Sequence, residues 1–269
     1  MTNNKRIIVI SSVLFVLICC PLFDLVEASS IDWSESFGAT NAEIAYSVVE
    51  VSDGGFILVG LRDFFDESLN DFWLVKTDEY GELKWAQTFG GNANEIAYSV
   101  VEASDGGFAL AGYTDSFGAG DLDFWLVKTD SNGNMQWNMT YGGVGGEMAY
   151  SVVEASDGGF ALAGYTDSFG AGDLDFWLVK TDQYGNIGWN QTFGGMQRDS
   201  AYSLIETSNG QFVLGGVTKS FDSGNGDFWI VVPDRYVIPE FSSWISLPIF
   251  LTIILIVLIY RKKINELRI

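Results

Sequence analysis

The segment DFWLVKTD at residues 123–130 decides the fold of this chain. It recurs unchanged at residues 71–78 and 175–182, and a divergent copy, DFWIVVPD, stands at residues 227–234. Successive side chains of a strand point to opposite faces, so Phe124 and Leu126 lie on one face and Trp125 and Val127 on the other. A strand that is apolar on both faces needs cover on both faces. The segment therefore predicts a sheet that is packed between two others.

The spacing of these copies is a constant 52 residues, and other segments keep the same step. Residues 97–130 and 149–182 are identical throughout. A period of about 50 residues that carries several strands is typical of propeller blades. The repeats also show where each unit begins. One tripeptide, Ala-Tyr-Ser, marks the start of each unit at residues 45–47, 97–99, 149–151 and 201–203.

Each unit is interpreted as four short strands. In the second unit we expect strands at 97–103, 108–114, 124–129 and 135–141. Residues 104–107 read Ser-Asp-Gly-Gly, and Asp-Gly between two β-branched runs is a strong hairpin signal because the turn needs positive φ. Gly133 is expected to be left-handed in the next turn. No stretch of the repeats shows a helical period.

Blades stacked face to face around an axis give every repeat the same cover. The predicted fold class is therefore all-β, a β-propeller of four 52-residue, four-stranded blades. An immunoglobulin-like sandwich is disfavoured because each of its sheets keeps one polar face. Two Trp per unit are expected to lie in the core between blades, the alternative being exposed rings that stack on bases or sugars.

The two ends of the array predict how the propeller closes. The fourth unit has no Trp strand after its third strand, while residues 31–37 form an orphan copy of that strand ahead of the first unit. We therefore expect the N-terminal strand to close a four-bladed monomer and to remove the exposed edges. The alternatives are an open array and two chains that complete an eight-bladed ring.

The sequences at both ends of the chain predict that the protein is exported. Residues 1–28 have two cations, an apolar run and small residues before a cleavage point, which is typical of a signal peptide. An uncleaved anchor is the alternative, and a lipid anchor at Cys20 fits poorly because Cys19 precedes it. Residues 241–260 form an uncharged run of about 30 Å as a helix, and the basic tail 261–269 follows. Positive residues favour the cytoplasmic side. The interpretation is a single-pass protein whose ectodomain, residues 29–236, is extracellular at the cell surface.

The juxtamembrane segment 237–243 contains Pro239-Glu240-Phe241. With the transmembrane helix and the basic tail, it resembles the PEF-type C-terminal sorting signal of archaeal surface proteins. That resemblance implies processing by an archaeosortase, with transfer to a lipid-type anchor. The family pattern often continues with Pro, where this chain has Ser242.

Composition excludes several classes of function. The chain has 269 residues, no His, and Cys only at Cys19 and Cys20, so neither a His-based triad nor a His-ligated zinc site can form. A net charge of -21 argues against a nucleic-acid partner. No constellation of catalytic residues stands out, so we expect no catalytic residues and no cofactor-binding or metal-binding residues.

Two features remain as candidate sites. Asn138 and Asn190 begin glycosylation sequons at equivalent positions of the fourth strand, although duplication of a chance match explains them equally well. The loop 115–123, repeated at 167–175, carries acidic residues and Gly in the manner of a calcium loop. The first and fourth units depart from that pattern, and an Asp that all four units share suits a structural hydrogen bond. Calcium therefore stays a minor alternative to having no cofactor.

Residues 31–235 resemble the Trp-rich tandem propeller repeats of archaeal and bacterial surface proteins, through the segments DGGF, DFWLVKTD and W-x-x-T-F-G-G. The resemblance implies a cell-surface propeller and no settled activity. The function we expect is that of a membrane-anchored extracellular scaffold or binding module for protein or glycan, without catalysis. The alternative is a polysaccharide hydrolase or lyase that uses carboxylates at the axial pocket.

Overall fold

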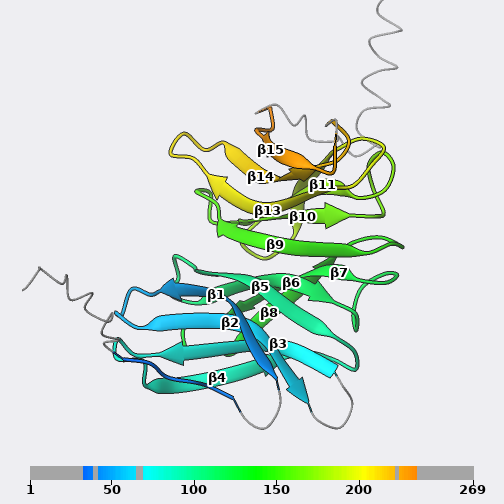
Figure 1. Ribbon diagram of the computed structural model, residues 1–269. Coiled ribbons are helices and arrows are strands. Elements are labelled where there is room, and N and C mark those ends of the chain that lie inside the picture. The colour runs from blue at the N-terminus through cyan, green and yellow to red at the C-terminus, as the bar shows by residue number, and fades with distance from the viewer. Residues whose placement is uncertain (1–32, 39–41, 65–68, 222–223, 235–269) are drawn as a thin grey trace, which may run out of the picture. The chain divides into compact units, whose positions relative to one another are not determined.

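The computed structural model describes residues 33–38, 42–64, 69–221 and 224–234, and their secondary structure is entirely β (Figure 1). By its internal contacts the chain divides into Met1–Glu35 and Ser36–Ile269, and all the strands belong to the second unit. The described ranges contain no helix that could cross a bilayer. The predicted signal peptide 1–28, the PEF-like segment 237–243, the helix 241–260 and the tail 261–269 lie outside the described residues.

Fifteen strands form four antiparallel sheets, one for each repeat. The first sheet contains β1 (Glu43–Glu50), β2 (Phe56–Phe64), β3 (Leu69–Thr77) and β4 (Leu83–Phe89). The second contains β5 (Glu95–Glu102), β6 (Phe108–Thr114), β7 (Asp123–Thr129) and β8 (Met135–Tyr141). The third contains β9 (Glu147–Glu154), β10 (Phe160–Thr166), β11 (Asp175–Thr181) and β12 (Ile187–Phe193). The fourth contains β13 (Asp199–Glu206), β14 (Phe212–Thr218) and β15 (Asp227–Val231). The predicted strands of the second unit are confirmed to within two residues.

Each sheet pairs its strands in chain order, so every connection inside a sheet is a hairpin. The predicted turns are confirmed, with Gly106 at φ 78° and Gly133 at φ 78°. The first turn is held by an ion pair in which Lys128 Nζ lies 2.8 Å from Asp105 Oδ2. The Lys128 side chain is buried, and its ammonium also donates to the carbonyl of Thr129 at 2.9 Å. This explains why DGGF and DFWLVKTD recur together.

The apolar core lies between the sheets and is divided into one cluster for each junction. Strand β7 contributes to two clusters, because Phe124 and Leu126 pack toward the third sheet while Trp125 and Val127 pack toward the first. All seven residues of β7 are buried. The prediction of a strand covered on both faces is therefore confirmed. Trp125 and Trp177 are buried as expected, whereas Trp85, Trp137 and Trp189 are only partly buried.

The junctions are also linked by polar contacts. Ser104 donates to Glu154 of the next sheet through both its backbone N–H (2.8 Å) and its hydroxyl (2.7 Å). The junction also holds two buried carboxyl groups, Asp123 and Glu147. Both face Gly142, where an added Cβ would lie 1.8 Å from Asp123 Oδ1 and 2.4 Å from Glu147 Oε2. Glycine is therefore needed beside the acid pair.

The sheets are arranged around their first strands. Strands β1, β5, β9 and β13 contact one another in sequence, and the rest of each sheet extends away from this row (Figure 1). The four sheets therefore follow one another along a row of inner strands. The array is open in the structure, because β1 is in contact with β5 whereas no comparable contact joins it to β13 or β15.

The predicted closure by the N-terminal strand is therefore corrected in one respect. Residues 33–38 form no strand, and the fourth sheet has three strands rather than four. The described chain therefore shows four sheets in an open row rather than a closed ring.

Candidate functional site

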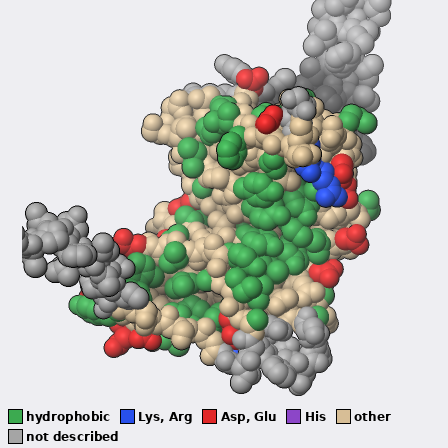
Figure 2. Space-filling model, in the orientation of Figure 1, with side chains coloured by type: hydrophobic (Ala, Val, Ile, Leu, Met, Phe, Trp, Pro, Cys, Tyr) green, Lys and Arg blue, Asp and Glu red, His purple; other side chains and the backbone are tan. Residues whose placement is uncertain are grey.

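A ladder of tyrosines crosses the inner edge of the array. The ring centroids of Tyr46 and Tyr98 are 5.0 Å apart, and those of Tyr98 and Tyr150, and of Tyr150 and Tyr202, are 5.1 Å apart. These four residues, one from the first strand of each sheet, are called the tyrosine ladder below. Figure 2 shows a band of hydrophobic side chains on this face of the molecule, in the region of the inner strands.

The ladder exists because each of its tyrosines is the extra residue of a β-bulge. In the pairing of β5 with β6, Ala97 is opposite Gly112 and Ser99 is opposite Ala111, so Tyr98 has no partner. A bulge turns the side chain of its extra residue away from the regular alternation. The same skipped residue occurs in the other three sheets. The bulge thus aims one phenol from each sheet at the same edge.

A glycine opposite the bulge makes this geometry possible. A Cβ added to Gly112 would lie 1.8 Å from the carbonyl oxygen of Ile96, and one added to Gly164 would lie 1.8 Å from that of Met148. No side chain fits at that distance from backbone. The spacing Ala-Tyr-Ser followed by glycine in the next strand is therefore the sequence signature of the ladder.

Each tyrosine of the ladder has an apolar ring face and a polar hydroxyl group at the edge of the ring. Tyr46 and Tyr202 are exposed, and Tyr98 and Tyr150 are half-buried. Burial, with smaller contributions from neighbouring tyrosines, raises the pKa of Tyr150 to about 12 and raises the pKa of Tyr98 as well. The phenols of Tyr98 and Tyr150 therefore stay neutral at ordinary pH. They offer aromatic faces together with hydroxyl groups that can donate and accept, which suits the stacking and hydrogen bonding of a sugar or a peptide.

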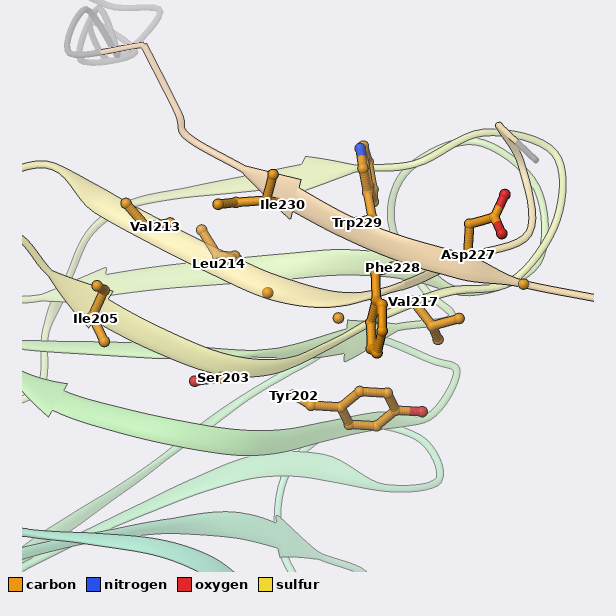
Figure 3. Close-up of a pocket in the computed structure, with 13 residues that line it drawn as sticks. Tyr202, Ser203, Ile205, Val213, Leu214, Val217, Asp227, Phe228, Trp229 and Ile230 are labelled. Atoms are coloured by element: carbon orange, nitrogen blue, oxygen red, sulfur yellow. The ribbon is translucent and has the colours of Figure 1, made fainter.

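The face of the last sheet forms an apolar groove beside the end of the ladder (Figure 3). It has a volume of about 880 Å³ and is lined by Tyr202, Ile205, Val213, Phe228 and Ile230, among others. Phe228 is fully exposed and Ile230 is 70% exposed, whereas their equivalents in the preceding sheet, Phe176 and Leu178, are completely buried. Figure 3 shows Phe228 and Tyr202 on the same side of the sheet. The groove is thus the face that another sheet would cover.

The sequon residues Asn138 and Asn190 lie on the fourth strands, β8 and β12, and both are exposed. Each also has a structural contact, since Asn138 Oδ1 accepts from Trp125 Nε1 at 3.1 Å and Asn190 Oδ1 accepts from Trp177 Nε1 at 3.2 Å. The amide nitrogen, to which a glycan is attached, is not the atom that binds the indole. Glycosylation therefore stays a prediction that the geometry permits.

The first sheet has Ala86 at the equivalent position, and there the buried Nε1 of Trp73 has no hydrogen-bond partner. We expect Ala86→Asn to stabilise the protein by about 1 kcal/mol, because it supplies the acceptor found in the next two sheets. Asn138→Ala should destabilise it by about 1 to 3 kcal/mol, because it leaves a buried indole unpaired. Chemical denaturation of protein made without glycosylation would measure both. Equal midpoints for the two variants would contradict this role.

The proposed calcium loop is organised around a hydrogen bond rather than around a group of acids. Asp123 turns inward and accepts from the backbone N–H of Ala119 at 2.8 Å, as expected for a structural Asp, while Asp115 and Asp121 are exposed. Within the described residues, no three acidic side chains come close enough together to hold a metal ion.

The fold is thus a row of four antiparallel sheets with an aromatic inner edge. No family model matches the chain. It is similar to the regulatory protein FlaEY of Caulobacter vibrioides, with 28% identity over 163 residues. The alignment covers 52% of this chain and 17% of that protein, so the chain spans less than a fifth of the length of the relative.

Neither the tyrosine ladder nor the groove is predicted from the sequence alone. The recurrence of Ala-Tyr-Ser in every unit is a sequence feature from which the ladder could be predicted. The tripeptide was used only to locate the start of each repeat. The groove had no comparable signal, because Phe228 and Ile230 belong to a motif that is buried in every other repeat.

Proposed function

We propose that the protein is a membrane-anchored extracellular binding module or scaffold, that its repeats are a sector of a β-propeller, and that it acts without catalysis. The observation that supports this most is the tyrosine ladder, which repeats a surface of stacked phenols at steps of about 5 Å. A regular aromatic surface can bind an extended ligand over several of its units. A glycan or an extended protein segment has the matching chemistry.

Substitutions in the ladder test the binding function. The full chain in detergent is screened on a glycan array and against candidate cell-surface polypeptides, and the hits are titrated by calorimetry. Tyr98→Leu and Tyr150→Leu should each weaken binding at least tenfold, because each removes a hydroxyl and an aromatic face from the middle of the ladder. Tyr184→Leu is the matched control, since Tyr184 is exposed on the turn between β11 and β12, away from the inner strands. Equal binding by the ladder variants and the control would refute the role of the ladder.

The location at the cell surface has its own test. Protease added to intact cells should remove the repeats, residues 29–236, and leave the membrane fraction with a short C-terminal fragment. Intact-mass analysis of the membrane-extracted protein tests processing near Pro239-Glu240-Phe241: a mass that includes residues through Ile269 excludes cleavage by an archaeosortase. The same spectra test glycosylation, because Thr140→Ala and Thr192→Ala should each remove the mass of one glycan from the protein.

A further inference from the structure

The junction between neighbouring sheets is built three times in this chain with the same contacts. In each, a Phe of one sheet packs on a Trp of the next: ring centroids are 4.6 Å apart for Phe72–Trp125, 4.7 Å for Phe124–Trp177 and 4.6 Å for Phe176–Trp229. A repeated geometry of this kind defines what each face of a sheet can bind.

One half of that junction is left over at each end of the array. Phe228 of the last sheet has no following Trp in the described chain, and it is fully exposed. Trp73 of the first sheet is partly exposed, whereas its equivalents Trp125 and Trp177 are 1% and 2% exposed. Val48, on β1 of the same sheet, is 61% exposed, and its equivalents Val100 and Val152 are each 4% exposed.

The Ser–Glu hydrogen bond of the junction also has one partner left over at each end of the array. At three junctions a Ser hydroxyl donates a hydrogen bond to the carboxylate of a Glu in the next sheet, in the pairs Ser52–Glu102, Ser104–Glu154 and Ser156–Glu206. The remaining members of this series are Ser208 on the last sheet and Glu50 on the first, and both are exposed. The tyrosine ladder likewise ends at Tyr202 and Tyr46. Both end faces therefore carry complementary halves of one interface.

The described chain does not join these halves within itself, because β1 is packed on β5 and has no comparable packing on the last sheet. We propose that the last face of one copy packs on the first face of a second copy, and that two copies close a ring of eight sheets with no end face exposed. A head-to-tail contact that closes after two copies is a symmetric dimer, and it extends the tyrosine ladder into a continuous ring. The proposal depends on the propeller part of the proposed function and not on its ligand.

The oligomeric state of the full chain in mild detergent tests this proposal. Light scattering corrected for detergent should give a protein mass of about twice 29.6 kDa. Phe228→Asp and Val48→Asp, one on each face, should each shift the mass to that of a monomer while the circular dichroism spectrum is retained. Val144→Asp is the matched control, because Val144 is 87% exposed in the loop between β8 and β9 and belongs to neither face. A monomeric unmodified chain would overturn the proposal, and so would an open series of higher oligomers.

Crosslinking distinguishes closure between copies from closure within one copy. Glu50→Cys and Ser208→Cys are placed on separate chains in which Cys19 and Cys20 are replaced by Ser. Mixing the two chains with a short thiol crosslinker should yield a covalent dimer, which neither chain forms alone. If the mixed chains do not crosslink, but a single chain with both cysteines forms an internal crosslink, closure occurs within one copy and the two-chain ring is wrong. These outcomes do not depend on glycan or peptide binding, so they can fail separately from the proposed function.

Discussion

Gly216→Ala should destabilise the protein by about 3 kcal/mol or more, because the added methyl group has no room beside the bulged strand. A Cβ at Gly216 would lie 2.1 Å from the carbonyl oxygen of Ser200 and 2.8 Å from Cα of Ala201. Both obstacles are backbone atoms of the bulged strand, so they cannot move without opening the pairing of β13 with β14. Urea denaturation followed by tryptophan fluorescence would measure the loss.

The neighbouring residue in the same strand provides the control. Gly215 has no atom within 4 Å of an added Cβ, and the second and third repeats carry Ala at this position, Ala111 and Ala163. Gly215→Ala should therefore change stability by less than about 1 kcal/mol, in the stabilising direction, because Ala restricts the unfolded chain more than Gly does. Equal losses for the two variants would mean that the bulge does not impose the glycine.

Asp123→Asn should stabilise the protein by about 2 to 3 kcal/mol at pH 8 and have little effect at pH 4. Burial, assisted by the negative charge of Glu147, raises the pKa of Asp123 from its ordinary value of 3.8 to about 6. The folded state then binds this proton more tightly than the unfolded state does. The contribution of Asp123 to stability is therefore greatest below pH 3.8 and is lost as the pH rises through 6.

Asparagine has no such titration and keeps an oxygen to accept from the backbone N–H of Ala119. The difference between the variant and the unmodified protein should therefore grow from pH 4 to pH 6 and then stay constant. Asp121→Asn is the matched control, because it makes the same chemical change at an exposed position of the same loop. A difference that is independent of pH would show that Asp123 is already ionised at acidic pH in the folded protein.

Most of the fold could be predicted from sequence because the repeat supplies its own internal comparison. Strands 108–114 and 135–141 are confirmed at both ends, since Gly and Asp turns bound them. The burial of both faces of β7 could be predicted from its uninterrupted run of apolar residues. Closure could not be predicted in the same way, because it depends on how far each sheet is rotated from the last, and that rotation is set by packing across a whole junction.

The candidate site was missed for a related reason. Tyr98 lies in a strand whose alternation would place it on one face, and only the register of β5 against β6 shows that it is skipped. A bulge is a property of two paired strands, so one strand alone does not reveal it. Gly112 was the available clue, because a glycine inside an apolar strand often marks a bulge or a close approach of backbone.

The identity of residues 97–130 and 149–182 has a consequence for how this gene can change. Every junction uses the same partners on its two sides, so removal or duplication of one whole 52-residue unit would bring together surfaces that already fit each other. Tandem repeats of closely similar coding sequence also favour unequal recombination. We therefore expect related strains to differ in the number of units by whole steps, with the inner aromatic row becoming longer or shorter while each contact stays as it is.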